Sequence, residues 1–485
     1  MRICSTMNGL KVTMVLRFTV LLLGASILAC VPVVSQTDDT RLPSPVPAQT
    51  DIGNSATPVN DNDNGNRTYD DRMQTPPPVS GEAYPTELVS EERSNFLRGR
   101  LSFTSAYMDN ALPSLNGRPV SDISYSVAPY VRVDETTSRM HAALEYAPGF
   151  TFYQRLNARN DAGHNASIDF QYRLSPHVTF LAHDDFLKSS NIFNQLTVST
   201  SQPVSGGAQE PNLSVIAPVA DLLSNSGSLG IRYQFARNSM IGANGTFFDL
   251  HYPNPAQVPG LYDAGSQGGS AFYSFRISRR HYIGANYQYQ RLMAYPVNGI
   301  TKTQTHTLLF VYTIYPTLNF SISFFAGPQH ADTIQPPRSQ AQSFPELRQW
   351  SPAAGASLSW QGRSNSFAIS YSHVISGGGG LTGAVEMDNA TGAIRQRMSK
   401  TLTASVSGSY VRNNLLGPSL IGDTNGHSTS ATALLEQQVG QHWSVQLGYS
   451  RIHQTYSNVA AVSLTPSTNR EFVSVSYQFL RPLGR

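Results

Sequence analysis

The chain has 485 residues, of which 34 are basic and 31 acidic, so its formal net charge is +3. Charged residues make up only 13% of the chain, well below the usual quarter, yet the mean hydropathy is slightly negative at −0.25. This near-neutral balance excludes a strongly basic nucleic-acid-binding protein. Frequent Tyr (23) and Phe (22), together with many small polar residues and few charges, are instead typical of a transmembrane β-barrel.

Residues 1–35 have the pattern of an export signal. The cations Arg2, Lys11 and Arg17 come before or at the start of an apolar run that reaches residue 34, and small residues then permit cleavage before Gln36. We therefore expect export through the Sec pathway. Two alternatives stay open, namely a retained membrane anchor and lipoprotein processing at Cys30.

Both cysteines, Cys4 and Cys30, lie inside this segment. After cleavage before residue 36 the chain would have none, which excludes disulfides and thiolate metal sites. No later run approaches the roughly 20 apolar residues that a membrane helix needs. If the protein is in a membrane, we expect it to cross by strands, and we expect no cofactor and no metal.

Residues 36–94 are rich in Pro, Asn and Asp and poor in large apolar residues, which predicts a disordered periplasmic segment. This segment carries 11 acids and 4 bases (net −7), whereas residues 95–485 carry 20 acids and 27 bases (net +7). The segment is therefore interpreted as a solvated linker or, alternatively, as a tail that enters a mildly basic lumen.

From residue 97 onward we find eighteen short runs in which apolar and small polar residues alternate, the pattern of strands with two different faces. They begin with residues 97–108 and 123–133 and end with 443–454 and 471–479. Short turns alternate with long loops between them, as in outer-membrane barrels. Residues 95–485 are therefore predicted to form an all-β fold, a closed antiparallel transmembrane β-barrel of about 18 strands (16 is the alternative), with short periplasmic turns and long extracellular loops.

The final run, EFVSVSYQF over residues 471–479, illustrates the two faces. Val473, Val475, Tyr477 and Phe479 share one face, and small polar residues share the other. We expect the apolar face to meet lipid, because a spanning sheet must close and pair all its edges. One run fits this pattern poorly, since residues 308–312 are apolar on both faces, which indicates either inner packing or an error of register.

At this point the chain resembles Gram-negative outer-membrane β-barrels of the porin-like kind, over about residues 97–479. The resemblance implies the cell outer membrane, contact with its lipid, and an assembly machinery that reads the terminal aromatic residues, here Tyr477 and Phe479. Six residues follow Phe479, which departs from that pattern. The segment 146–195 also resembles barrels associated with exopolysaccharide export.

Mostly uncharged polar residues on the predicted inner faces suit the passage or binding of small polar solutes such as sugars. The lumen-lining candidates are Asp169, Gln171, Arg173, Arg232, Gln234, Arg276, Asn286, Gln288, Gln290 and Gln446. The function we predict is a pore or export channel for small polar solutes or polysaccharide, without covalent chemistry. A simpler interpretation is that these side chains only fill a narrow interior.

Two other functions remain open: a closed structural or adhesive barrel with binding loops, and a barrel hydrolase. His183 and Asp185 share a face and are the residues that could supply acid–base or metal chemistry. A salt bridge or hydrogen bond is the preferred interpretation of this pair, and we predict no enzymatic activity and no catalytic residue.

Overall fold

The structure, a computed structural model, describes residues 95–112, 119–190, 193, 212, 214–215, 221–297, 299–317, 319–335, 346–362, 364–416, 425–459, 462 and 467–482. The predicted export signal and the predicted disordered segment lie outside these residues. Among the described residues, no helix is long and apolar enough to cross a membrane.

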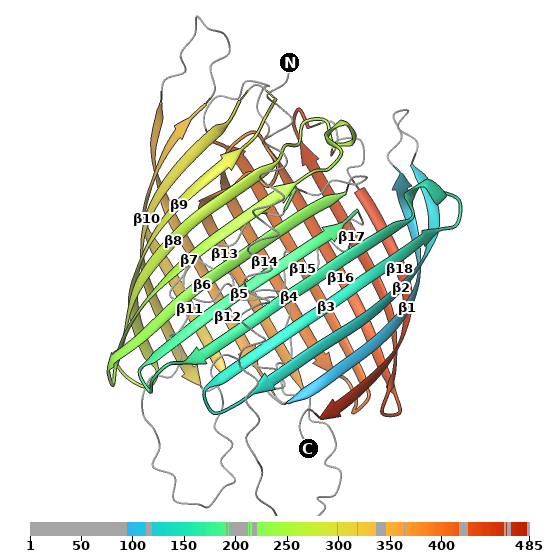
Figure 1. The fold of residues 1–485 in the computed structure, drawn as a ribbon, viewed down its shortest axis with the longest axis horizontal. Coiled ribbons are helices and arrows are strands. Elements are labelled where there is room, and N and C mark those ends of the chain that lie inside the picture. The colour runs from blue at the N-terminus through green and yellow to red at the C-terminus, as the bar shows by residue number, and fades with distance from the viewer. Residues whose placement is uncertain are drawn as a thin grey trace, which may run out of the picture. The chain divides into compact units, whose positions relative to one another are not determined.

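Eighteen antiparallel strands form one sheet (Figure 1), which confirms the predicted strand number and fold class. In chain order they are β1 Phe96–Leu112, β2 Val120–Thr136, β3 Met140–Tyr153, β4 Asp161–Arg173, β5 Val178–Ser189, β6 Leu222–Ala236, β7 Ser239–His251, β8 Ala264–Arg276, β9 His281–Ala294, β10 Thr301–Thr317, β11 Phe320–Ile334, β12 Leu347–Gln361, β13 Asn365–Ser376, β14 Val385–Arg397, β15 Leu402–Leu415, β16 Gly426–Val439, β17 Trp443–Tyr456 and β18 Ser467–Pro482. In the described parts of the connections there are two single 3₁₀ turns, η2 Asn157–Arg159 and η3 Pro255–Gln257.

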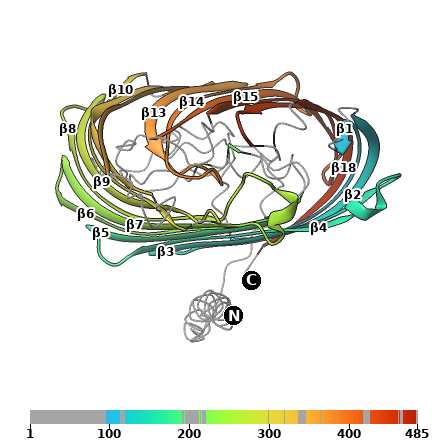
Figure 2. The same ribbon diagram turned by 90° about the horizontal axis from the view of Figure 1, so that it is seen from above.

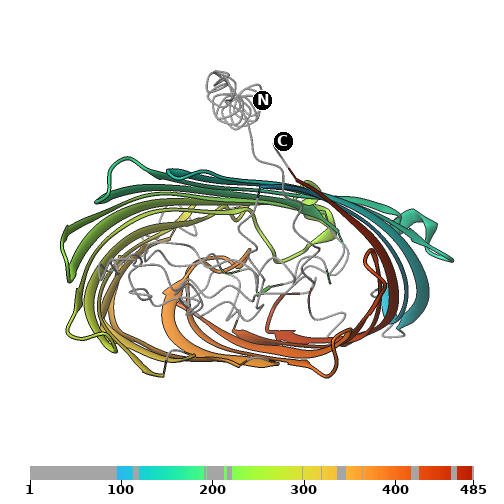
Figure 3. The same cartoon turned by 90° about the horizontal axis from the view of Figure 1, so that it is seen from below.

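The sheet closes on itself because β1 pairs with both β2 and β18. The closing ladder runs from Phe96 opposite Pro482 to Met108 opposite Arg470. Figure 2 and Figure 3 show the closed ring from its two ends. No strand of the ring is left as a sheet edge, which is the condition for a sheet in hydrocarbon.

The two faces of the strands differ as the alternation predicts. On β18, Val473 and Phe479 are 46% and 45% exposed, whereas Ser474 and Ser476 are each 5% exposed. Large apolar side chains point outward around the ring, and small polar ones point inward. The interior of the barrel is called the lumen below.

Short turns join the strands at one end of the barrel and longer connections at the other. We call these ends the turn rim and the loop rim. The turn β6–β7 spans only residues 237–238, whereas the connection β7–β8 spans residues 252–263. Both described chain ends, at β1 and β18, lie at the turn rim, as an even strand number requires.

The doubtful run at residues 308–312 is an inwardly packed strand, not an error of register. On β10, Leu308, Phe310 and Tyr312 point outward, while Leu309 is 1% exposed and packs in an apolar cluster inside the barrel together with Val311. The strand is therefore apolar on both faces because its inner face also meets apolar groups.

Candidate functional site

The inner face of β1–β5 carries a network of charged side chains, which we call the charged wall. It comprises Arg98, Arg100, Tyr130, Arg132, Asp134, His141, Glu145, Asp169, His183 and Asp185. The register brings them together, because Arg132 on β2 lies opposite Arg98 on β1 and opposite Glu145 on β3.

Arg132 lies at the centre of this network. Its guanidinium lies 3.2 Å from Asp134 Oδ2 and 3.6 Å from Glu145 Oε2. The Tyr130 hydroxyl donates to the same Glu145 oxygen at 3.0 Å, and the Arg100 guanidinium stacks 4.8 Å above the Tyr130 ring. These contacts fix the positions of the long side chains relative to one another, so charge is presented to the lumen in a defined arrangement.

His183 on β5 lies between two carboxylates. Its Nδ1 is 2.6 Å from Asp169 Oδ1, and its Nε2 is 2.5 Å from Asp185 Oδ2. Two flanking carboxyl groups favour the form of this ring in which both nitrogens carry a proton, the imidazolium. Within the described part of the chain no cluster of His, Cys, Asp or Glu is suited to hold a metal ion.

The opposite side of the lumen, β10–β18, is lined mainly by hydroxyl groups, which we call the hydroxyl wall. Cross-strand pairs bond to each other, as in Thr313–Ser323 at 2.7 Å and Ser321–Ser359 at 2.6 Å. The pairs Ser370–Thr391 and Ser409–Ser430 repeat the motif at 2.6 and 2.7 Å. Each hydroxyl has one donor and two acceptor sites, so paired hydroxyls still offer acceptors to water or a solute.

Described apolar residues from four connections (β5–β6, β7–β8, β13–β14 and β17–β18) meet inside the barrel near the loop rim, where they pack against strand residues. This loop cluster includes Tyr252, Leu261, Leu381 and Val459, which pack with inward residues such as Leu309. In Figure 2 the segment that follows β13, drawn in orange, lies inside the ring of strands. The lumen is therefore narrowed at this level by folded chain.

Polar contacts fix the loop cluster in place. The Tyr262 backbone N–H donates to Gly380 O at 2.7 Å, which joins the β7–β8 and β13–β14 connections. On β15, the Asn413 amide donates to Ser214 and to the Tyr456 hydroxyl, both at 2.9 Å. Burial, together with the nearby Asp263 carboxylate, raises the pKa of the Tyr252 phenol, so this group stays neutral inside the cluster.

All ten lumen-lining candidates are on the inward face of their strands, but they are not gathered at one place. Asp169 belongs to the charged wall, and Gln171 and Arg173 continue β4 toward the turn rim. Arg276 is held at the turn rim, where its Nη2 donates to Asn238 Oδ1 at 2.8 Å. Arg232 and Gln234 lie on β6, and Gln446 lies across the barrel on β17.

The three candidates on β9 are buried, and so is Gln234 on β6. Asn286 is 0% exposed, and Gln288 and Gln290 are each 8% exposed. Their exposure fits the simpler interpretation, in which such residues fill the interior. Direct contact between any of the ten candidates and a solute stays a prediction.

Alternation alone does not single out the residues of β1–β3, which make up seven of the ten members of the charged wall. Arg100, Arg132 and Glu145 all lie within predicted runs, at positions where alternation assigns them to the inner face. The period-two pattern thus indicates that these side chains face inward, but it does not indicate which residues of neighbouring strands lie opposite one another.

Tyr477 and Phe479, the predicted assembly signal, point outward near the turn rim and are 39% and 45% exposed. Phe479 lies opposite Gly99 on β1, and its ring occupies the space that a side chain at Gly99 would fill. The ring therefore covers the closing ladder, while recognition by an assembly machinery stays a prediction.

Comparisons with known proteins add only a likeness of fold. No protein-family model matches the chain, and no curated protein matches it significantly. Among solved structures, Pseudomonas aeruginosa OccK11 (OpdR) gives a TM-score of 0.39 at 11% identity over 80% of this chain and 98% of its own. Acinetobacter baumannii OccAB4 gives 0.37 at 8% identity over 81% and 100%, and P. aeruginosa OpdQ gives 0.38 at 12% over 79% and 98%.

Likenesses this weak carry no argument about the solute, and they give no support to the expectation of polysaccharide export. The observed architecture itself confirms a closed eighteen-stranded antiparallel barrel with an apolar outer surface and a polar lumen, the design of an outer-membrane porin-like protein.

Proposed function

We propose that this chain is an outer-membrane channel for small polar solutes, acting through a hydrated lumen and without covalent chemistry. One observation carries the proposal. A closed sheet turns its apolar residues outward and lines its inside with a charged wall and a hydroxyl wall. Such a surface is stable in lipid, and such an interior replaces the hydration of a polar solute.

Two aromatic belts mark the membrane boundaries on the outer surface. Phe235, Trp443 and Phe479 lie exposed near the turn rim. Farther up, outward tyrosines bond to outward histidines, with Tyr146 Oη 2.9 Å from His164 Nδ1 and Tyr287 Oη 2.7 Å from His306 Nδ1. Amphipathic rings are typical of both edges of the apolar band of a membrane barrel. Because short turns are typical of the periplasmic end of such a barrel, the turn rim would face the periplasm.

The charged wall supports selectivity as well as passage. Charged side chains on the wall of a narrow pore act on passing ions over a short distance, through a medium of low effective dielectric constant. Within the His183 cluster, two carboxylates outnumber one imidazolium, so this part of the wall favours cations.

The experiment is single-channel recording of the purified chain in planar lipid bilayers, with reversal potentials in a KCl gradient. We expect discrete conductance steps, and we expect Asp169→Asn to lower the permeability ratio of K⁺ to Cl⁻. The matched control is Asp184→Asn. This substitution removes the same charge, but from the outward face of β5, at the position between His183 and Asp185. A ratio that Asp169→Asn leaves unchanged would place the ion path away from the charged wall.

The loop cluster favours a second candidate, a closed barrel whose loops bind partners. Apolar chain narrows the lumen near the loop rim, and a cavity beside Ser376, Gly377 and Leu292 measures about 20 Å³, room for one water molecule. Electrical silence of correctly folded protein in the same bilayers would favour this function over the channel.

A hydrolase is the least supported alternative. Ser228 lies opposite His183, but both nitrogens of His183 already face carboxylates. No nitrogen is left to accept a proton from a serine, which a Ser–His nucleophile requires.

A further inference from the structure

The barrel wall has one weak seam, between β12 and β13. Their ladder contains eight residue pairs, from Ala354 opposite His373 to Gln361 opposite Ser366. By contrast, β11–β12 has fourteen pairs and β13–β14 has twelve. Within the described strands, the loop-rim part of β12, residues 347–353, therefore pairs with β11 alone.

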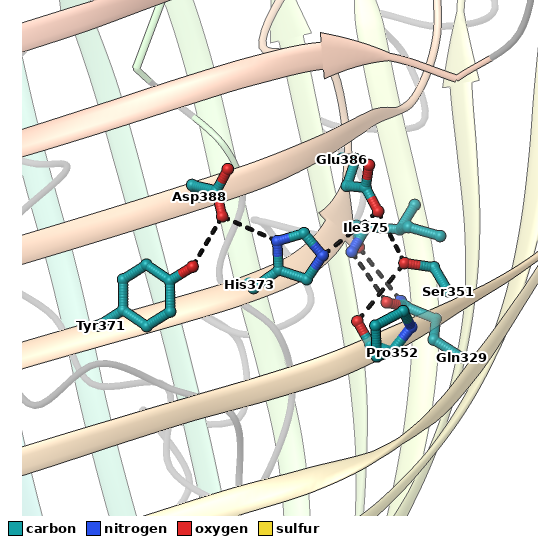
Figure 4. A network of polar contacts seen from close by, with 8 residues as sticks. All are labelled: Gln329, Ser351, Pro352, Tyr371, His373, Ile375, Glu386 and Asp388. Carbon is teal, nitrogen blue, oxygen red and sulfur yellow. Dashed lines mark hydrogen bonds and ion pairs between the residues drawn. The ribbon is translucent and has the colours of Figure 1, made fainter.

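The end of β13 turns into the lumen at this seam. Alternation with Ile369 and Tyr371 would point Ile375 outward, yet Ile375 is 0% exposed and packs with the inward residues Leu292 and Ala331. Its N–H donates to Gln329 Oε1 at 2.9 Å, and Gln329 Nε2 donates to Ile375 O at 3.4 Å. The carboxamide of Gln329 on β11 thus takes the place that β12 backbone would hold in a continuous sheet (Figure 4).

A chain of side chains also bridges the seam. The Ser351 hydroxyl on β12 donates to Glu386 Oε1 on β14 at 2.8 Å, across the end of β13. Glu386 lies 3.3 Å from His373 Nε2, and His373 Nδ1 lies 2.8 Å from Asp388 (Figure 4). Beyond His373, side-chain bonds hold this part of the wall where backbone ladders hold the rest.

The seam begins near the upper boundary of the apolar band of the membrane. His373, the last paired residue, is eight residues above Asn365 at the turn rim (373 − 365). At about 2.5 Å of height per residue, from a rise of roughly 3.3 Å and a tilt of about 40°, this is about 20 Å, below the top of a band about 25 Å tall. The backbone there cannot stay unbonded in hydrocarbon, so the edge of β12 needs polar groups or water from the lumen.

The inner side of the seam continues directly into the loop cluster. Residues 377–380 are four glycines, and Gly379 and Gly380 have φ values of +60° and +101°. A side chain at Gly380 would come 2.8 Å from the Tyr252 hydroxyl, so the segment lies closely on the cluster. Val374 and Leu381 on either side of the glycines are buried in it. Displacing residues 374–381 would therefore have two simultaneous effects: the lumen would widen, and β13 would separate from β12.

We infer that residues 374–384 are a lateral gate, through which amphipathic molecules with a hydrocarbon chain pass between the lumen and the outer leaflet. The apolar lining beside the seam suits the hydrocarbon chain, and the Ser351–Glu386–His373 chain of bonds suits a polar headgroup. The inference rests on the proposed membrane location and adds a sideways route to the proposed channel.

The test is cysteine labelling from the lipid phase. Past residue 30 the chain has no natural cysteine, so Ile375→Cys introduces a single site in the processed protein. The probe is a maleimide carried on an acyl chain in phosphatidylcholine vesicles. Ala368→Cys, inward on the paired part of β13 and 1% exposed, is the negative control, and outward Ile369→Cys is the positive control.

We expect Ile375→Cys to react at least ten times faster than Ala368→Cys, and slower than Ile369→Cys. Gln329→Ala removes two hydrogen bonds and should raise the rate at residue 375 by on the order of tenfold, while leaving the rate at residue 368 unchanged. A rise at both sites would mean general unfolding and would overturn the gate, as would equal rates at 375 and 368 in both backgrounds.

Conductance of the same proteins separates this inference from the proposed function. Open channels without labelling at residue 375 would remove the gate and leave the channel. Labelling without any conductance would remove the polar-solute channel and leave the lateral route.

Discussion

Replacing Leu447 by Arg tests whether the apolar face of this barrel meets lipid. Leu447 points outward from β17, is 57% exposed, and lies opposite Leu435 and Val473 on the neighbouring strands. It is four residues above Trp443 (447 − 443), so at about 2.5 Å per residue it lies about 10 Å above the turn-rim girdle, near mid-band.

An arginine at the midplane of a membrane barrel costs about 2–4 kcal/mol. We therefore expect Leu447→Arg to lower the free energy of unfolding by this amount, roughly a 30- to 1,000-fold change in the folding equilibrium. The measurement is a urea titration of the barrel folded into lipid vesicles, read by tryptophan fluorescence and heat-modifiable gel mobility.

The matched control is Gln446→Arg, at the adjacent inward position. There a charge meets the polar lumen, so we expect a change within about 1 kcal/mol, as for solvated surface substitutions. If Arg at 447 cost no more than Arg at 446, the outward face would be a water-exposed surface, and the membrane assignment would fail.

Three further predictions address the lumen and assembly. Gly380→Ala puts a Cβ into the loop cluster at a φ of +101°, so we expect the cluster to be displaced and the single-channel conductance to increase. In the control Gly377→Ala the nearest atom would be 3.8 Å from the new Cβ, so the conductance should stay at the wild-type value. Equal conductances of the two variants would show that the cluster does not limit ion flow. His183→Gln removes the cation between two carboxylates, so the reversal potential in a KCl gradient should shift toward greater K⁺ preference, and a shift toward Cl⁻ would contradict the cluster's assignment. Phe479→Ala removes the outward terminal aromatic, and we expect a smaller heat-modifiable fraction in outer membranes; wild-type levels would show that this ring is not read during assembly.

Alternation predicted every strand within the apolar band but not the strand ends near the loop rim. The run expected at residues 167–173 is the strand Asp161–Arg173, and the run at 228–236 is Leu222–Ala236. Near the top of the band and above it, outward positions carry polar residues such as His164 and Asn225, because that part of the wall meets headgroups and water. The two-faced pattern then disappears although the backbone ladder continues.

The inner features could not be predicted because they depend on which strands and loops meet. Alternation places Arg132 and Glu145 inward, but only the register puts one opposite the other. The loop cluster joins residues as distant as Tyr252 and Val459, which have no shared period. At Ile375 the period-two rule predicts the wrong face, because the strand leaves its ladder two residues earlier.

Two kinds of interaction stabilise this barrel: hydrogen bonds in the part of the wall that faces lipid, and hydrophobic burial near the loop rim. In lipid the apolar outer residues gain no hydrophobic free energy by packing on one another. The spanning wall therefore depends on backbone hydrogen-bond ladders and on hydroxyl pairs such as Thr313–Ser323. This explains why so few charges and so many Ser and Thr residues suffice. Near the loop rim water returns, and there the chain builds an apolar core around Tyr252 and Leu309 by ordinary hydrophobic burial. The β12–β13 seam lies where the first kind of interaction stops and the second begins, so it is the part of the wall that the fewest interactions hold closed.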